Sequence, residues 1–113
     1  WDGRSVLASV ERFDQSQGRW FECAPMKVPR ASPAVAVLDG FLYVMGGFDG
    51  RDWLAQVERY DPGKDAWEAV APMSRPRSAF AACAANGTIY AVGGSDGAMS
   101  QRSVERYSPR TNT

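Results

Sequence analysis

The stretch Tyr43-Val44-Met45-Gly46-Gly47-Phe48-Asp49-Gly50 returns as Tyr90-Ala91-Val92-Gly93-Gly94-Ser95-Asp96-Gly97, 47 residues further along the chain. The same step carries Val10-Glu11-Arg12-Phe13 to Val57-Glu58-Arg59-Tyr60 and then to Val104-Glu105-Arg106-Tyr107. One offset aligns the whole chain without a gap. A repeat of this period is a single supersecondary unit that buries its faces only against stacked neighbours. The sequence therefore predicts a repeat architecture with a shared frame, whose specificity lies in the loops that differ between copies.

The chain of 113 residues divides into three unequal copies of this unit. Residues 1–26 correspond to the second half of a copy, residues 27–73 to a complete copy, and residues 74–113 to a copy without its last strand. Terminal repeats of such arrays normally carry polar caps, and neither end of this chain shows one. We therefore expect the chain to be a section of a longer array.

The complete copy predicts four short antiparallel strands. The first two, Ala34–Leu38 and Phe41–Met45, flank Asp39-Gly40, a dipeptide typical of two-residue hairpin turns. The third, Gln56–Tyr60, alternates apolar and polar residues, and the fourth is Trp67–Val70. Four antiparallel strands of this length form one blade of a propeller, so we predict an all-β fold with little helix.

The first strand of each copy is rich in small apolar residues, and its equivalent in the third copy is Ala79–Ala84. Continuous apolar runs are typical of strands that are covered on both faces, and small residues suggest a crowded place near a central axis. Asn86-Gly87 stands where the complete copy has Asp39-Gly40. We therefore interpret Asn86-Gly87-Thr88 as a hairpin turn and not as a glycosylation site.

Gly46-Gly47 and Gly93-Gly94 close the second strand of their copies. Glycine weakens a strand, so a pair of glycines that repeats at the end of this strand indicates a bulge or the close approach of another backbone. We interpret both pairs as packing devices. Neither pair belongs to a Gly-x-Gly-x-x-Gly or Walker sequence with a following helix, so no phosphate-binding loop is predicted.

Composition excludes several classes of function. Lysine and arginine number 13, aspartate and glutamate also number 13, and this balance argues against nucleic-acid or membrane-surface binding. No apolar run approaches the roughly 20 residues that span a bilayer. The chain has no histidine, which removes Ser-His and Cys-His nucleophiles and His-ligated metals, so we expect no enzyme activity, metal or cofactor. We expect Cys23 and Cys83 to be buried reduced thiols of a cytoplasmic protein.

These repeats resemble the Kelch repeat, in which a diglycine closes the second strand, a tyrosine lies in the third and a tryptophan opens the fourth. The resemblance covers essentially the whole chain, and the matching residues are Gly46, Gly47, Gly93, Gly94, Phe13, Tyr60, Tyr107, Trp20 and Trp67, with Phe13 in the place of a tyrosine. The sequence Val-Glu-Arg-Tyr-Asp-Pro is most similar to segments of the Kelch domains of BTB–Kelch proteins. That resemblance implies a six-bladed β-propeller and a substrate receptor of a cullin-3 ubiquitin ligase, linked to cullin-3 through a BTB segment outside these residues.

In the family that the chain resembles, ligands contact two sets of loops on one face. Carried over by position, the first set follows each diglycine, at residues 1–7, 48–54 and 95–101, and the second joins consecutive copies at residues 27–33 and 74–79. Varying loops on a repeated frame are typical of an interaction surface, and arginine and aromatic residues are favoured as anchors. The candidate partner-binding residues are Trp1, Arg4, Arg30, Ser32, Phe48, Arg51, Asp52, Trp53, Arg77, Ser78, Ser95 and Met99.

Two groups of these loop residues repeat between copies. Arg30 and Arg77 occupy the same position, so they either bind carboxylates of a ligand or serve the blade itself, and repetition favours the structural role. Asp2-Gly3, Asp49-Gly50 and Asp96-Gly97 also repeat, and we predict that they form turns.

Three functions are compatible with the sequence. The first is a protein- or peptide-binding propeller that serves a cullin-3 ligase, and the second is an actin-binding or scaffolding Kelch protein. The third is an isolated or engineered propeller fragment with only a structural role, which assembles from several chains. Incomplete rings leave unpaired strand edges, which invite association, so we predict that this section alone is not a stable monomer.

Overall fold

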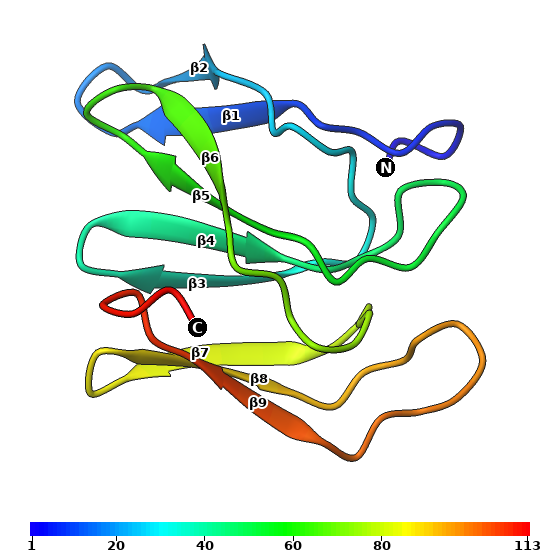
Figure 1. Cartoon of the computed structure of the whole chain (residues 1–113). Helices are drawn as coiled ribbons and strands as arrows, with labels where there is room; N and C mark the ends of the chain where they lie inside the picture. The colour runs from blue at the N-terminus through cyan, green and yellow to red at the C-terminus, as the bar shows by residue number, and fades with distance from the viewer.

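The computed structural model describes all 113 residues as nine β-strands joined by turns and loops (Figure 1). The strands are β1 (Val10–Asp14), β2 (Arg19–Cys23), β3 (Ala34–Leu38), β4 (Phe41–Met45), β5 (Val57–Asp61), β6 (Ala66–Val70), β7 (Ala81–Ala85), β8 (Thr88–Val92) and β9 (Val104–Tyr107). Equivalent strands of successive copies begin 47 residues apart, as β1 and β5 do. The predicted all-β fold is confirmed. No helix in the structure is long and apolar enough to cross a lipid bilayer.

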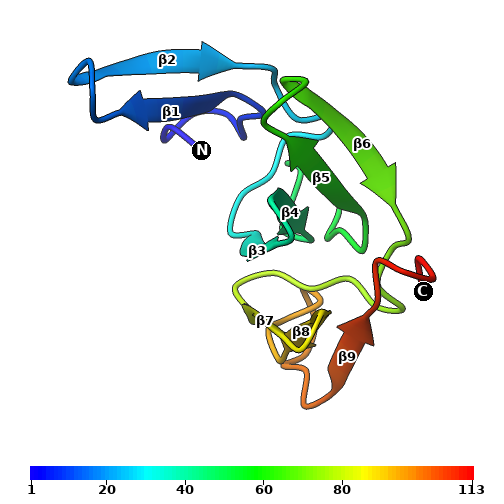
Figure 2. The same ribbon diagram turned by 90° about the vertical axis from the view of Figure 1, so that its left-hand side faces the viewer.

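Consecutive strands pair antiparallel and form three sheets, β1–β2, β3–β4–β5–β6 and β7–β8–β9. The sheets fan out side by side, with β3 and β7 on the inner side and β2 and β6 on the outer side (Figure 2). Asp39-Gly40 joins β3 to β4 with φ of 52° and 81°, and Asn86-Gly87 joins β7 to β8 with φ of 50° and 73°. Positive φ at both central residues matches the twist of the flanking strands, so the predicted hairpin turns are confirmed.

Both faces of the middle sheet pack against other parts of the chain, and side chains alternate between these faces along each strand. One face packs Tyr60 and Trp67 against the β1–β2 sheet and its connection to β3. The other face packs Tyr43 and Met45 against Ile89 of β8. Full burial of a large apolar side chain contributes roughly 1.5–3 kcal/mol. Stacking between sheets is therefore a main source of stability for each repeat.

Hydrogen bonds tie the middle sheet to the connection that precedes it. The indole N–H of Trp67 donates to the carbonyl oxygen of Ala24 at 2.8 Å. Asp65 Oδ1 accepts from the N–H of Ala24 at 2.9 Å and from the hydroxyl of Tyr60 at 2.6 Å. The hydrogen bond to Asp65, followed by burial, raises the pKa of Tyr60 above its ordinary value. These bonds fix the distance between neighbouring sheets.

The third sheet repeats the arrangement with an amide in place of the carboxylate. Asn112 Oδ1 accepts from the N–H of Ala71 at 2.9 Å and from the hydroxyl of Tyr107 at 2.8 Å. Asp65 and Asn112 have φ of 48° and 54°, and Gly18, at the same position of the first copy, has φ of 66°. Left-handed backbone favours glycine, asparagine and aspartate, which explains the residue types found at this position.

The prediction that the first strand of each copy is covered on both faces is wrong. Ala34 and Ala36 of β3 are buried, but Val35 and Val37 are 49% and 65% exposed. Val35 pairs with Val44 and Val37 with Leu42, so both valines lie on the face of the middle sheet that is turned toward the first sheet. The first sheet consists of β1 and β2 only and has no inner strand to cover them. Cys83 of β7 is likewise exposed and not buried as expected.

One face of the first sheet has no other sheet packed on it. The rings of Phe13 and Trp20 lie 5.4 Å apart, much as those of Tyr60 and Trp67 do at 5.1 Å. Trp20 is nevertheless 62% exposed, because no sheet packs on that face of β1–β2. The structure of this section does not test the predicted number of six blades or the predicted self-association, so both stay predictions.

Candidate partner-binding edge

The long connections share one edge of the three sheets, on the right-hand side of Figure 1. We call this the loop edge; it comprises residues 1–9, 24–33, 46–56, 71–80 and 93–103. The tight turns lie on the opposite edge, which we call the hairpin edge (Figure 1). Because paired strands run antiparallel, the loops after β4 and β8 return on the same edge as the connections between sheets. The two predicted loop sets therefore meet on one edge.

Gly46-Gly47 lets the β6–β7 connection approach the end of β4. These glycines have φ of 61° and 97°, and the N–H of Gly47 donates to the carbonyl oxygen of Arg77 at 2.7 Å. A Cβ at Gly46 would overlap that oxygen, and a Cβ at Gly47 would lie 2.6 Å from the carbonyl oxygen of Ala31. Only glycine adopts this backbone with no side-chain volume. The predicted packing role of this diglycine is confirmed.

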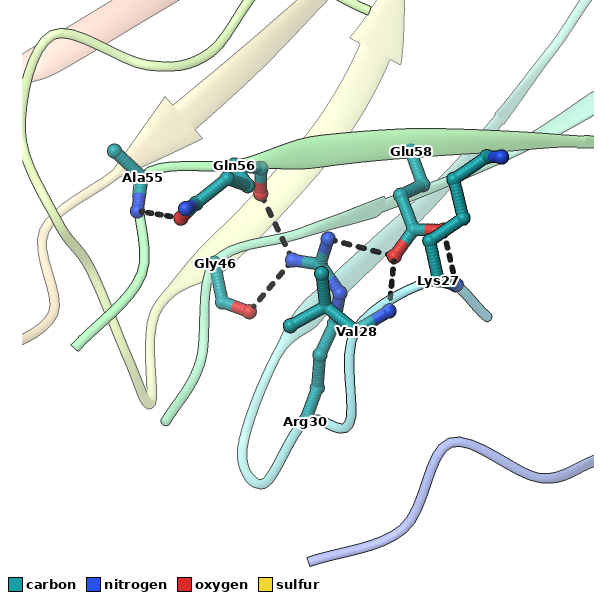
Figure 3. Close-up of polar contacts among 7 residues, drawn as sticks. All are labelled: Lys27, Val28, Arg30, Gly46, Ala55, Gln56 and Glu58. Atoms are coloured by element: carbon teal, nitrogen blue, oxygen red, sulfur yellow. Dashed lines mark hydrogen bonds and ion pairs between the residues drawn. The ribbon is translucent and has the colours of Figure 1, made fainter. Parts of the chain in front are cut away.

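A buried ion pair holds the β2–β3 connection on the middle sheet (Figure 3). The Arg30 guanidinium donates to the carbonyl oxygens of Gly46 at 2.9 Å and Gln56 at 2.8 Å, and to Glu58 Oε2 at 2.9 Å. Glu58 also accepts the N–H of Lys27 at 2.7 Å. The side chains of Arg30 and Glu58 are 0% and 2% exposed. Burial of this depth is tolerated because both charges are paired and hydrogen-bonded.

The third copy has the same pair. Arg77 donates to Glu105 Oε2 at 3.1 Å and to the carbonyl oxygens of Gly93 at 2.8 Å and Ser103 at 2.9 Å. Partial burial alone would raise the pKa of Glu105, but hydrogen bonds from Ser74 and Arg77 outweigh it and lower the pKa. Neither Arg30 nor Arg77 has guanidinium surface left for a partner. Their place among partner-binding residues is corrected: both hold the blade together.

The Asp-Gly pairs form turns, as predicted. Asp49 Oδ1 accepts the N–H groups of Arg51 and Asp52, each at 2.8 Å, and these bonds from Asp52 and Arg51 lower the pKa of Asp49. Asp2 and Asp96 make the same two contacts in their loops. At the first place after the Asp-Gly pair, two copies have arginine and the third has alanine (Arg4, Arg51 and Ala98). At the second place all three copies differ (Ser5, Asp52 and Met99).

Trp53 contacts an aromatic ring of its own loop and the backbone of the next loop. The rings of Phe48 and Trp53 lie 4.6 Å apart in the β4–β5 loop. Trp53 also covers Gly97 of the next loop, where a Cβ would stand 2.5 Å from the indole. Val6 lies at the same position of the first copy, and a Cβ at Gly50 would stand at an ordinary contact distance of 3.8 Å from it. Trp53 keeps 40% of its surface exposed, so it is both a loop-to-loop contact and an available anchor.

An apolar cavity of about 210 Å³ lies between the second and third sheets and is lined by Tyr43, Met73, Ile89 and Tyr107 among others. At the equivalent place between the first and second sheets, Trp67 packs beside Met26, Leu42 and Tyr60. The cavity therefore lies at a position where side chains of neighbouring sheets normally pack, and we do not interpret it as a ligand pocket. The structure has no cluster of three or more His, Cys, Asp or Glu side chains that could hold a metal ion.

The model of the Kelch motif matches residues 29–74 and 76–113, well over half of the chain. The chain belongs to the Kelch-repeat family. Its three sheets are a section of a Kelch β-propeller.

Curated Kelch proteins match shorter parts of the chain. An F-box/kelch-repeat protein of Arabidopsis thaliana is 46% identical over 38% of this chain, and Kelch-like protein 38 of Mus musculus is 46% identical over 41%. Kelch-like ECH-associated protein 1B of Danio rerio is 39% identical over 39%. The matches cover only 15%, 8% and 8% of those relatives' own lengths. The solved structure of YjhT shares the fold, with a TM-score of 0.85 and 17% identity over 93% of this chain and 43% of that chain.

The Kelch frame places the predicted residues in three classes. The exposed ones are Trp1, Arg4, Ser32, Arg51, Asp52, Trp53 and Met99; Phe48 and Ser95 are half-buried; Arg30, Arg77 and Ser78 are buried. Ser78 and Ser95 come together, because each N–H donates to the other's carbonyl oxygen, at 2.9 and 3.0 Å. Sequence reasoning did not pair the two arginines with Glu58 and Glu105. The signal was present, since both pairs keep a separation of 28 residues.

Proposed function

We propose that the loop edge binds a segment of a protein partner and that the chain serves as the substrate-recognition module of a cullin-3 ubiquitin ligase adaptor in the cytoplasm. One observation carries the first part: the same Asp-Gly turn presents side chains that differ in charge, size and polarity at two consecutive places. These are Ser5, Asp52 and Met99 at one place, and Val6, Trp53 and Ser100 at the next. A frame that needed those residues for folding would repeat them, as it repeats Arg30 and Glu58. The varying residues are thus free to serve recognition.

The exposed chemistry of the loop edge suits a protein ligand. Trp1, Trp53 and Met99 leave 70%, 40% and 70% of their surface exposed and come from three successive loops. Arg4 and Arg51, at equivalent places of two loops, form no ion pair within the chain. Aromatic and arginine side chains are the usual anchors of protein interfaces, where removal of a strong anchor costs 2 kcal/mol or more, which is about 30-fold in Kd.

The ligase role is supported by the kind of proteins that match. Several are Kelch-like proteins, one is an F-box/kelch-repeat protein, and one from cowpox virus is a Kelch repeat and BTB domain-containing protein. A propeller without catalytic residues would contribute recognition, while the remaining part of such a protein would recruit the ligase.

The test compares captured proteins from cells that express the intact protein as wild type, as the Arg51→Ala/Trp53→Ala variant, or as the Lys64→Ala control. Lys64 is exposed in the β5–β6 turn on the hairpin edge. We expect cullin-3 with all three forms. We also expect at least one client that the double variant captures about 30-fold or more weakly, whose ubiquitination falls with its capture.

Two results would contradict the proposal in separate ways. A client set unchanged by Arg51→Ala/Trp53→Ala would remove the loop edge as the recognition surface. Failure to capture cullin-3 would remove the adaptor role and leave a binding module of another kind. Co-sedimentation of the intact protein with actin filaments would assign it to the actin-binding alternative.

A further inference from the structure

A hollow of about 300 Å³ on the loop edge collects polar side chains from two connections. It lies between the β6–β7 connection and the β8–β9 loop, which run along the same edge in Figure 1. The lining residues that matter here are Arg75, Asp96, Ser100, Gln101, Arg102 and Ser103. Arg75 and Arg102 stand far apart in sequence, and the fold places both in the lining of this hollow.

The other copies have different residues at these places. The positions of Arg75 and Arg102 hold Val28 and Ala55 in the complete copy. The positions of Ser100 and Gln101 hold Trp53 and Leu54 there, and Leu54 is buried. The same frame is therefore built with apolar residues, so folding does not need the two arginines of the third copy.

The charges around the hollow leave both arginines without a partner. Neither Arg75 nor Arg102 takes part in an ion pair of the chain. Asp96 is already bound by the turn, because its Oδ1 accepts the N–H groups of Ala98 and Met99, each at 2.9 Å. The hollow is therefore lined by two unpaired guanidiniums and by one carboxylate, whose Oδ1 is used by the turn.

Two serine hydroxyls in the lining add neutral donors. Ser103 Oγ accepts from Arg77 Nη2 at 2.6 Å, which leaves its own O–H free to donate. Arg77 is itself neutralised by Glu105, so this deeper ion pair adds no net charge to the site. Ser100 supplies a second hydroxyl at the rim. The hollow thus combines two unpaired cations with hydroxyl donors.

We propose that this hollow binds the phosphorylated side chain of a serine or threonine in a protein partner. Guanidinium groups bind phosphate in a bidentate geometry, and a phosphate monoester carries three acceptor oxygens and a charge of about −1.5 to −2. Two arginines and two hydroxyls match that group better than a single carboxylate. A nucleic-acid backbone suits the surface less, because its binding requires a basic stripe and the chain has no net charge. The identity of the partner's phosphorylated segment rests on the proposed function of the loop edge.

The test measures the hollow directly, in the intact protein with ¹⁵N-labelled arginine. The probes are acetyl-Gly-Ala-X-Ala-Gly-amide peptides with X as phosphoserine, glutamate or serine, and inorganic phosphate. We expect the phosphoserine peptide to shift the Nε–H signals of Arg75 and Arg102 saturably, with a Kd at least about tenfold lower than that of the glutamate peptide. Arg75→Ala/Arg102→Ala should weaken binding by about tenfold or more, because each charge-assisted hydrogen bond contributes substantially.

The control variant Lys64→Ala/Arg110→Ala removes two exposed positive charges away from the loop edge and should bind the phosphoserine peptide as wild type does. Equal loss in this control, or shifts that do not saturate, would show charge screening alone and overturn the site. Equal affinity for the glutamate peptide would overturn phosphate selectivity, and binding of inorganic phosphate without the phosphoserine peptide would overturn a protein ligand. Because these probes need no natural partner, failure here is distinguishable from an unchanged client set for Arg51→Ala/Trp53→Ala.

Discussion

Replacing Arg30 by methionine tests how the repeated frame is held together. The substitution keeps an unbranched side chain but removes the donors to Gly46, Gln56 and Glu58, at 2.9, 2.8 and 2.9 Å. Glu58 would remain buried with only backbone N–H donors. Removing one partner of a buried ion pair costs about 3–5 kcal/mol, a large part of a typical total stability of about 5–15 kcal/mol.

Urea unfolding of the intact protein, followed by tryptophan fluorescence, measures this loss. The matched control is Arg12→Met, since Arg12 lies 3.8 Å from Asp14 with its side chain 58% exposed, and such a pair contributes about 0–1 kcal/mol. We expect Arg30→Met/Glu58→Leu to recover much of the loss, because it leaves no buried charge alone. An Arg30→Met variant within about 1 kcal/mol of the Arg12→Met control would refute the structural role assigned to this pair.

The remaining predictions concern packing, pH and the stacking hydrogen bond. Gly46→Ala should destabilise the protein by clearly more than Gly40→Ala in thermal unfolding, because both have positive φ but only Gly46 has no room for a Cβ. Folding lowers the pKa of Glu105, so the ionised carboxylate stabilises the protein above the ordinary pKa of 4.5, and this stabilisation is lost as pH falls through the folded pKa. The urea unfolding midpoints of wild type and Glu105→Gln should therefore converge in acid. A difference between them that stays constant with pH would contradict this prediction. Trp67→Phe removes a buried hydrogen bond and should cost about 1–3 kcal/mol in urea unfolding, whereas Trp20→Phe, at an exposed site, should change little.

Much of the fold could be predicted from the 47-residue step because local and repeated features agree. The Asp39-Gly40 turn, the strand alternation and the diglycine step all depend on short-range backbone conformation, which residue type controls directly. Exposure was harder to predict. The valines of β3 and Cys83 look like core residues, but their surroundings depend on which strands stand beside them, and composition alone does not show that.

The site was predictable only in outline. The repeat located the loops and the Asp-Gly turns, because differences between copies can be read along the chain. The buried role of Arg30 depends on Glu58, which stands 28 residues away on another strand. Arg75 and Arg102 line one hollow because two connections come together when the sheets stack, and neither connection alone predicts this.

Site-specific photo-crosslinking of the intact protein to its captured client tests most directly that recognition belongs to the loop edge. A benzophenone side chain would replace Trp53 on this edge or Lys64 on the hairpin edge. The proposed role predicts a covalent client adduct from position 53 and none from position 64. An adduct from position 64 alone would show that the partner contacts the opposite edge and that the varying loops are not its binding surface.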